Sequence, residues 1–350
     1  MATRRQFLER LALGLAVAAC QTHVAQPAEK AVYVGVETSA TTGLSTASFF
    51  SASGSRVSSI YLGFRAHGFA QQGNHLVVFP RRPGNRFAII DLGSFEILSV
   101  VTAPKDRHFY GHGAFTADGR TFLATENNLA SLGGSIGVYE LDRSARRVGE
   151  IDLPLAGPHE IVRAGPSDRF LIALGGLQTH PDYGRAAFNL PTFRSQVISL
   201  NFASGTFDAF DFWSGTEGVS LRHLAMDDKG RIYVGGQKKD MARARTAQVA
   251  WYVDGQIVKP IEISDLTDGY VSSVAARGTQ ALITSKETGR VVHLDGDNVL
   301  RSEEIDGASA AALGDPFGIV SGYGTLCIGE KRVGVRDGQE FDNHGLLIKI

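Results

Sequence analysis

Four histidines recur along this chain at nearly regular intervals. They are His67, His112, His159 and His223, and the steps between them are 45, 47 and 64 residues. Histidine is the commonest side-chain metal ligand and titrates near neutral pH. Imidazole nitrogen suits zinc, copper, iron and nickel. If the fold brings these side chains together, the sequence predicts a site for a transition metal or another small ligand.

Further polar residues are close in sequence to these histidines. Glu126 and Glu160 could add carboxylate ligands or orient the imidazole rings. Arg222 directly precedes His223 and could bind an anion or pair with a nearby aspartate. A polar segment from His180 to Arg185 supplies a further candidate ligand in His180.

A structural role for the same histidines is the main alternative. In a repeated fold, a histidine at the start of each unit can donate to a backbone carbonyl of the next unit and link the two units together. An enzyme is another alternative, with a metal ion as Lewis acid and Glu126 or Glu160 as base. We favour a binding role over catalysis.

The histidines fall at matching points of an internal repeat. One unit begins at Gly111–Thr116, turns at Asp118-Gly119, continues through Thr121–Glu126 and ends with two more alternating runs near residues 134–141 and 148–153. Alternation with period two predicts half-buried strands, and Asp-Gly between such runs predicts a hairpin. Four strands in about 40 to 50 residues are typical of one blade of a β-propeller.

Six unit starts can be recognised, at His67, His112, His159, His223, Ser273 and Phe317. Three more strands precede the first start, over residues 31–37, 46–51 and 56–62, and we expect them to join a last strand over 346–350 in a closing blade. Joining both ends of the chain in one sheet removes exposed sheet edges. We therefore predict an all-β propeller of seven four-stranded blades, with six as the alternative. No helix of ordinary length is expected after residue 20.

The step from His159 to His223 is long because an insertion with little strand alternation lies at residues 178–194. Propellers often place such a loop over one mouth of the central channel. Inner strands line that channel, so the four repeated histidines are expected to face one another near this mouth.

Residues 1–20 have the features of a bacterial export signal. Arg4-Arg5 in Thr3–Leu8 resembles the twin-arginine consensus, and an apolar run from Leu11 to Ala19 is too short to span a bilayer as a helix. Val17–Cys20 resembles a lipobox, which predicts lipidation of Cys20 and a polar tether over 21–30. We expect a monomeric periplasmic protein, exported folded, that touches the membrane only through its lipid anchor. The propeller domain would span residues 31–350.

Composition excludes several other classes. Net charge is −1 for the whole chain and −3 without residues 1–20, so charge gives no case for nucleic-acid binding. The two cysteines are too few for a cysteine-rich zinc site or an iron–sulfur cluster. With Cys20 lipidated, Cys327 has no partner, and its apolar surroundings predict an inert buried thiol.

The combined motifs resemble a proteobacterial family of exported propellers known as domain of unknown function 1513. The residues that carry the resemblance are Arg4-Arg5, His67-Gly68, Gly111-His112-Gly113, Pro158-His159-Glu160, Thr179–Asp182 with Asn189-Leu190, and Leu221–Leu224. The resemblance implies a fold similar to quinoprotein-amine-dehydrogenase-like and surface-antigen propellers. Genes of such proteins often lie beside imelysin-like and dihaem-peroxidase-like genes linked to iron uptake, which implies iron or metal handling with envelope partners. The resemblance supplies no catalytic residues.

Overall fold

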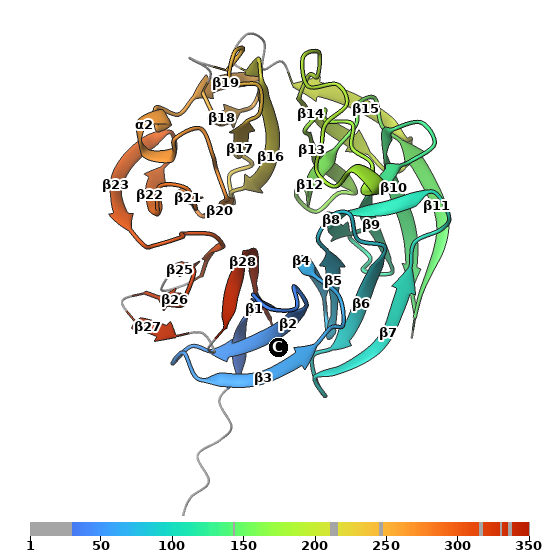
Figure 1. The fold of residues 1–350 in the computed structure, drawn as a ribbon, viewed down its shortest axis with the longest axis vertical. Helices are drawn as coiled ribbons and strands as arrows, with labels where there is room; N and C mark the ends of the chain where they lie inside the picture. The colour runs from blue at the N-terminus through green and yellow to red at the C-terminus, as the bar shows by residue number, and fades with distance from the viewer. Residues whose placement is uncertain are drawn as a thin grey trace, which may run out of the picture.

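Seven antiparallel sheets of four strands each form a ring around a central axis (Figure 1). The computed structural model describes residues 30–142, 144–210, 216–244, 248–314, 318–329, 331–334 and 338–349. The protein is therefore a seven-bladed β-propeller, as predicted, and the six-bladed alternative is wrong. The export signal, Cys20 and nearly all of the 21–30 tether lie outside the described residues.

Six blades are each built from four consecutive strands, with the first strand of each nearest the axis (Figure 1). The first three of these blades comprise β4 (Ala66–Gln72), β5 (His75–Pro80), β6 (Arg86–Asp91) and β7 (Glu96–Thr102); β8 (Arg107–Phe115), β9 (Thr121–Asn128), β10 (Gly133–Leu141) and β11 (Ala145–Asp152); and β12 (Pro158–Arg163), β13 (Arg169–Leu174), β14 (Gln196–Asn201) and β15 (Thr206–Phe210).

The next three follow the same order. They comprise β16 (Val219–Met226), β17 (Ile232–Lys238), β18 (Ala250–Asp254) and β19 (Ile257–Pro260); β20 (Ser273–Arg277), β21 (Gln280–Ser285), β22 (Arg290–Asp295) and β23 (Asn298–Glu304); and β24 (Ala311–Leu313), β25 (Gly318–Ser321), β26 (Thr325–Ile328) and β27 (Lys331–Gly334).

The seventh blade closes the ring with strands from both ends of the propeller. Its order is β28 (Gln339–Leu347), β1 (Ala31–Ser39), β2 (Ser45–Ser51) and β3 (Arg56–Tyr61). In Figure 1 the red β28 lies beside the blue β1 at the inner side of this blade. The predicted closure is confirmed. The last strand nevertheless begins earlier than the predicted 346, because polar residues at 342–344 hide its alternation.

The start of the sixth predicted unit was placed wrongly. Its inner strand is β24, three residues of Ala311–Leu313, whereas Phe317 lies outside the described residues and Gly318 opens the second strand. A strand this short and without histidine carries no repeat signal that reasoning from sequence can recognise.

The core lies between neighbouring blades. Phe79, Phe87, Phe122 and Tyr139 are fully buried and pack edge-to-face or stacked between the β4 and β8 blades. Burying each such ring contributes roughly 1.5–3 kcal/mol. Cys327 is buried as predicted, and its burial raises the pKa of the thiol.

The described helical elements include one short turn, η1 (Pro181–Tyr183), and one four-residue helix, α2 (Ser264–Thr267). No helix in this part of the chain is long and apolar enough to cross a membrane.

Candidate functional site

Five histidines meet at the axis of the ring, one from each of five inner strands. These central histidines are His67 on β4, His112 on β8, His159 on β12, His223 on β16 and His344 on β28. Centroids of neighbouring rings lie 4.5 to 6.1 Å apart. The four histidines found in the sequence are thus brought together, and a fifth joins them.

A β-bulge interrupts the pairing of every inner strand that carries a central histidine. On β12, Pro158 pairs with Leu174 and Glu160 with Ala173, so His159 is an extra residue with no partner. Comparable register shifts occur on β4, β8, β16 and, against β1, on β28. A bulge bends the strand and re-aims the side chain. The bulges therefore explain how strands at different angles direct imidazoles to one point.

The other two inner strands are regular. β20 pairs with β21, and β24 with β25, without any register shift. They begin at Ser273 and Ala311 and contribute no histidine to the site.

A buried carboxylate orients His67. Its Nδ1 lies 2.9 Å from Oδ1 of Asp342 on β28, and Arg81 donates to Oδ2 of the same carboxylate at 2.7 Å. The positive charge of Arg81 and the contact with His67 hold the pKa of Asp342 well below its usual range, against the effect of burial. Since Asp342 stays ionised, Nδ1 of His67 carries the proton, and its Nε2 offers a free lone pair.

Glu160 plays a similar part for His112. Its Oε1 lies 2.8 Å from Nδ1 of His112, and its Oε2 lies 3.8 Å from Nδ1 of His223. Burial raises the pKa of Glu160. Paired carboxylate and histidine in this arrangement are the usual outer partners of metal-binding imidazoles.

Several nitrogens of the central histidines are buried without any hydrogen-bond partner. These atoms are Nε2 of His112, Nε2 of His344, Nδ1 of His159 and Nδ1 of His223. An unsatisfied buried polar atom costs roughly 1–3 kcal/mol, and most folded proteins avoid it. The four atoms at this point are therefore free to bind a ligand.

Burial keeps the central histidines neutral. It lowers the pKa of His67 and of His112 to about 3 and that of His223 to about 4. Burial also lowers the pKa of His159 and of His344 well below the usual value. Neutral imidazole is the form that binds metal ions.

Two sets of three ligand atoms lie within 4.8 Å of one another. One set comes from His67, His112 and His344, and the other from Glu160, His223 and His344. His344 belongs to both sets.

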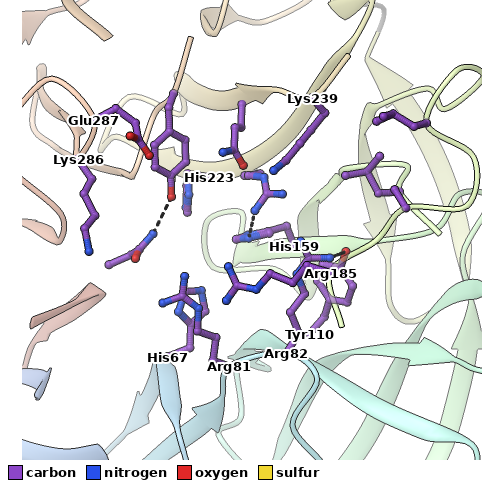
Figure 2. Close-up of a pocket in the computed structure, with 17 residues that line it drawn as sticks. His67, Arg81, Arg82, Tyr110, His159, Arg185, His223, Lys239, Lys286 and Glu287 are labelled. Atoms are coloured by element: carbon purple, nitrogen blue, oxygen red, sulfur yellow. Dashed lines mark hydrogen bonds between the residues drawn. The ribbon is translucent and has the colours of Figure 1, made fainter. Parts of the chain in front are cut away.

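A cavity of about 430 Å³ opens on one side of the central histidines (Figure 2). His67, His159 and His223 form part of its wall, and Arg81, Arg82, Arg185, Lys239 and Lys286 surround them. A second cavity of about 350 Å³ is lined by His112, Glu160 and His344. The cluster thus lies between two spaces that a small ligand could enter.

Arg222 also reaches the site. Its Nη1 lies 3.4 Å from Nε2 of His159, and burial lowers its pKa to about 10.

Two predicted residues are not brought to the central histidines. Glu126 points into the interior of its blade, where Tyr139 and Arg147 donate to it at 2.8 Å. His180 begins η1, accepts from the backbone of Asp182 at 3.3 Å, and is not among the residues lining the 430 Å³ cavity. Closeness in sequence to a histidine was a poor guide for Glu126, because a strand's alternate residues face opposite ways.

His344 and Asp342 were missed by reasoning from sequence. The signal for His344 is its following glycine, since His344-Gly345 repeats the pattern of His67-Gly68. No comparable signal marks Asp342.

The proposed linking of blades by histidine takes a different form. His67 contacts Asp342 and His112 contacts Glu160, so each pair joins neighbouring blades through a carboxylate rather than through a backbone carbonyl. These pairs hold the inner strands together and orient the rings at the same time.

Comparisons with known proteins agree on the fold. A family model described as "Protein of unknown function (DUF1513)" matches residues 60–348. A hydrazine synthase chain of Kuenenia stuttgartiensis is 14% identical and has a TM-score of 0.63, with 91% of this chain and 98% of that chain covered. The WD40 repeats of RRP9 are 12% identical with a TM-score of 0.52 (85% and 92% covered).

A chain of a nidogen/laminin complex is likewise 12% identical with a TM-score of 0.52 (78% and 94% covered). Identities this low show a shared fold alone. The search of curated proteins finds no match.

Proposed function

Since the chain belongs to the DUF1513 family, whose function is unknown, we propose a function from its own site: the propeller binds one divalent transition-metal ion at the channel axis. The ligands are His67, His112 and His344. The observation that carries the proposal is that ligand atoms of these three neutral imidazoles lie within 4.8 Å of one another, and that Nε2 of His112 and Nε2 of His344 are buried without a hydrogen-bond partner.

The spacing suits three metal–nitrogen bonds after a small adjustment. Nitrogens bound at about 2.0–2.1 Å to one tetrahedral metal lie about 3.4 Å from one another. The three nitrogens here lie within 4.8 Å of each other, so each ring needs to move inward by less than about 1 Å. Three histidine ligands would leave room for a further ligand; His67 lines the 430 Å³ cavity, and His112 and His344 line the 350 Å³ cavity.

The carboxylates around the rings support the same proposal. Asp342 and Glu160 contact Nδ1 of His67 and of His112, which favours the tautomer with a free lone pair on Nε2 of each ring. Among first-row metals, imidazole ligands suit zinc, copper, iron and nickel.

We also propose that this binding takes place in the periplasm. Arg4-Arg5 and Cys20 support export by the twin-arginine route and attachment to a membrane. That route carries folded proteins, so the ion could be bound before export. A role in iron or metal handling with envelope partners fits a site of this kind.

Metal content and binding test the proposal directly. The mature protein without a tag is purified, freed of metal with the uncharged chelator 1,10-phenanthroline, and titrated with Zn²⁺, Cu²⁺, Fe²⁺ or Ni²⁺ by calorimetry. We expect one site, with a thermal shift that corresponds to about 2.7 kcal/mol at a hundred times the dissociation constant. His344→Ala should weaken binding at least a hundredfold.

The control is His293→Ala, which removes an imidazole on β22 whose Nε2 lies 2.6 Å from Oε1 of Glu303, away from the central histidines. It should leave metal binding unchanged. If no metal binds the wild-type protein, or if His344→Ala binds as tightly as wild type, the proposal is wrong and the histidines serve to link the blades.

A metal-assisted hydrolase is the second candidate, favoured by one observation. Glu160, whose pKa is raised by burial, lines the 350 Å³ cavity next to the proposed ligands, as an acid or base must. A screen of esters and lactones with the metal-loaded protein tests it. Activity that Glu160→Gln lowers at least a hundredfold at unchanged metal content would support the enzyme; no turnover of any ester or lactone would exclude it.

A further inference from the structure

The 430 Å³ cavity has an unusual charge. Six basic side chains line it, and Glu287 is the one acidic residue among the lining residues. The basic residues are Arg81, Arg82, Arg185, Arg222, Lys239 and Lys286. Its volume lies within the range of small-molecule sites, about 300–1,000 Å³.

Almost none of this positive charge is neutralised by the protein. Arg81 pairs with Asp342 at 2.7 Å. Within the described part of the chain, the other five basic residues of the cavity form no ion pair. Arg82 instead contacts Tyr110, and Lys286 lies over the ring of Tyr323. Mutual repulsion of unpaired cations is unfavourable in the folded protein, so an anion in the cavity would relieve it.

Arg222 shows this most clearly. It is 8% exposed, and its Nε is buried with no hydrogen-bond partner. Among the residues that the structure describes, the one hydrogen-bond contact of its side chain is the long 3.4 Å approach of Nη1 to Nε2 of His159. A buried guanidinium with an unused donor, on the wall of a cavity, is a group that lacks its acceptor.

The cations come from four blades and face one space (Figure 2). Arg82 follows β5, Lys239 follows β17 and Lys286 follows β21, while Arg185 reaches in from the loop between β13 and β14. Charge spread over several sides of a cavity suits an anion whose charges are also separated. Guanidinium groups suit planar carboxylates and phosphates through two parallel hydrogen bonds.

The surroundings of Lys239 disfavour its charged form. Burial, together with Arg222, Arg82 and Arg185, lowers the pKa of Lys239 to about 7. A bound anion would reverse this effect and hold the ammonium charged.

From this geometry we infer that the cavity binds a small organic anion bearing several carboxylate or phosphate groups, directly beside the central histidines. The positive charge of this site comes from the basic side chains, so the site does not depend on a metal ion. Where a metal is also bound, the anion would balance part of its charge, since His67 lines this cavity.

Calorimetry on the full mature protein tests the inference. Metal is first removed with 1,10-phenanthroline, because the usual chelators are themselves polyanions. Citrate and glucose 1,6-bisphosphate represent the carboxylate and phosphate sources, and acetate and inorganic phosphate represent anions with a single group. We expect the two larger anions to bind at least tenfold more tightly than the single-group anions, with affinity falling as salt rises.

Variants locate the binding. Arg185→Gln changes an exposed loop residue and Lys239→Gln a residue just after β17, so neither is needed for the core. Each should weaken anion binding at least tenfold. Arg146→Gln is the matched control, because Arg146 lies exposed on the outer strand β11 and should leave binding unchanged.

The two proposals fail separately. Anion binding without any metal binding supports this inference and contradicts the metal site. Anion binding that needs metal and is lost in His344→Ala, but not in Arg185→Gln or Lys239→Gln, supports the metal site and overturns this inference. The absence of anion binding, with and without metal, also overturns it.

Discussion

The inner strands of this propeller are of two kinds. Five of them, β4, β8, β12, β16 and β28, contain a bulge and carry a central histidine. The other two, β20 and β24, keep regular pairing and carry serine or alanine where they begin. All seven occupy the same place in their blades, so the fold itself does not require bulges.

This difference indicates that the five bulges serve a purpose other than stability. A bulge leaves a residue outside the ladder and gives up hydrogen bonds that a regular strand keeps. In the five bulged strands this loss coincides with buried imidazoles, four of which have nitrogens without partners or with only one long contact. Departures from regular packing that recur at one point of a fold are expected at functional sites.

Acidification should produce the largest difference between the two kinds of strand. Below about pH 6.5 the unfolded chain protonates its histidines, whereas the folded protein keeps His67 and His112 neutral to about pH 3 and His223 to about pH 4. The unfolded state then binds more protons, so the free energy of unfolding falls as pH falls. Each histidine contributes about 1.4 kcal/mol per pH unit.

Two buried carboxyls act in the opposite direction, since the raised pKa values of Glu126 and Glu160 favour the folded state on acidification toward pH 4.5. Five histidines outweigh them. Urea unfolding of the metal-free protein at pH 7.5, 6.5 and 5.5 should show a loss of several kcal/mol. His159→Asn should make this slope shallower, and Ser273→Ala in β20 should not; a flat profile would contradict the neutral state of the site.

Adding a side chain to a glycine in a bulged strand should have the next largest effect on stability and metal binding. Gly111 in β8 has φ +120°, and a Cβ there would lie 2.6 Å from Cδ2 of His67. Gly111→Ala should therefore destabilise the protein by about 2 kcal/mol or more and weaken metal binding at least tenfold, because both the backbone and His67 must shift. Thermal unfolding and metal titration measure the two effects.

Gly278, in the turn between β20 and β21, is the matched control. It has φ +62°, but a Cβ would meet nothing within 4 Å. Gly278→Ala should cost only about 1 kcal/mol of backbone strain and leave metal affinity unchanged. Equal loss of metal binding in both variants would mean that the bulges have no special role.

A smaller effect on metal affinity is expected when the contact that orients the ring of His112 is weakened. Glu160→Gln keeps the shape of the side chain but removes the charge that contacts His112. Metal affinity should fall about 10- to 100-fold, as for outer-shell partners elsewhere. In the regular strands, Ser273→Ala removes an acceptor for Ala311 N at 3.3 Å and should cost about 1 kcal/mol of stability with no change in affinity. An unchanged affinity in Glu160→Gln would show that the carboxylate serves only to join the blades.

Much of the fold was predictable because its signals are local. Alternation along strands such as 121–126 and turns such as Asp118-Gly119 recur in each blade, and period two is a property of the strand itself. Four of the five central histidines followed from the repeat for the same reason.

The remaining parts of the site depend on contacts between distant segments. His344 and Asp342 lie within the irregular pairing of β28 with β1, which breaks the alternation that marks a strand. Arg185 comes from a loop without a repeat counterpart, and the loop's path is set by Asn189, which bonds to the backbone of Gln178 and Gly176. The spacing of residues within one segment does not show which distant segment it will contact.

The closing strand has a consequence for the order in which the molecule is made. His67 and Asp342 are 275 residues apart, yet they share one hydrogen bond at the axis. A ribosome must therefore translate beyond residue 344 before the site exists, and a nascent chain holding four of the central histidines still lacks the fifth. The complete site therefore forms only after nearly the whole chain has been made, and a ligand that contacts both β4 and β28 would favour the closed ring over partly closed ones.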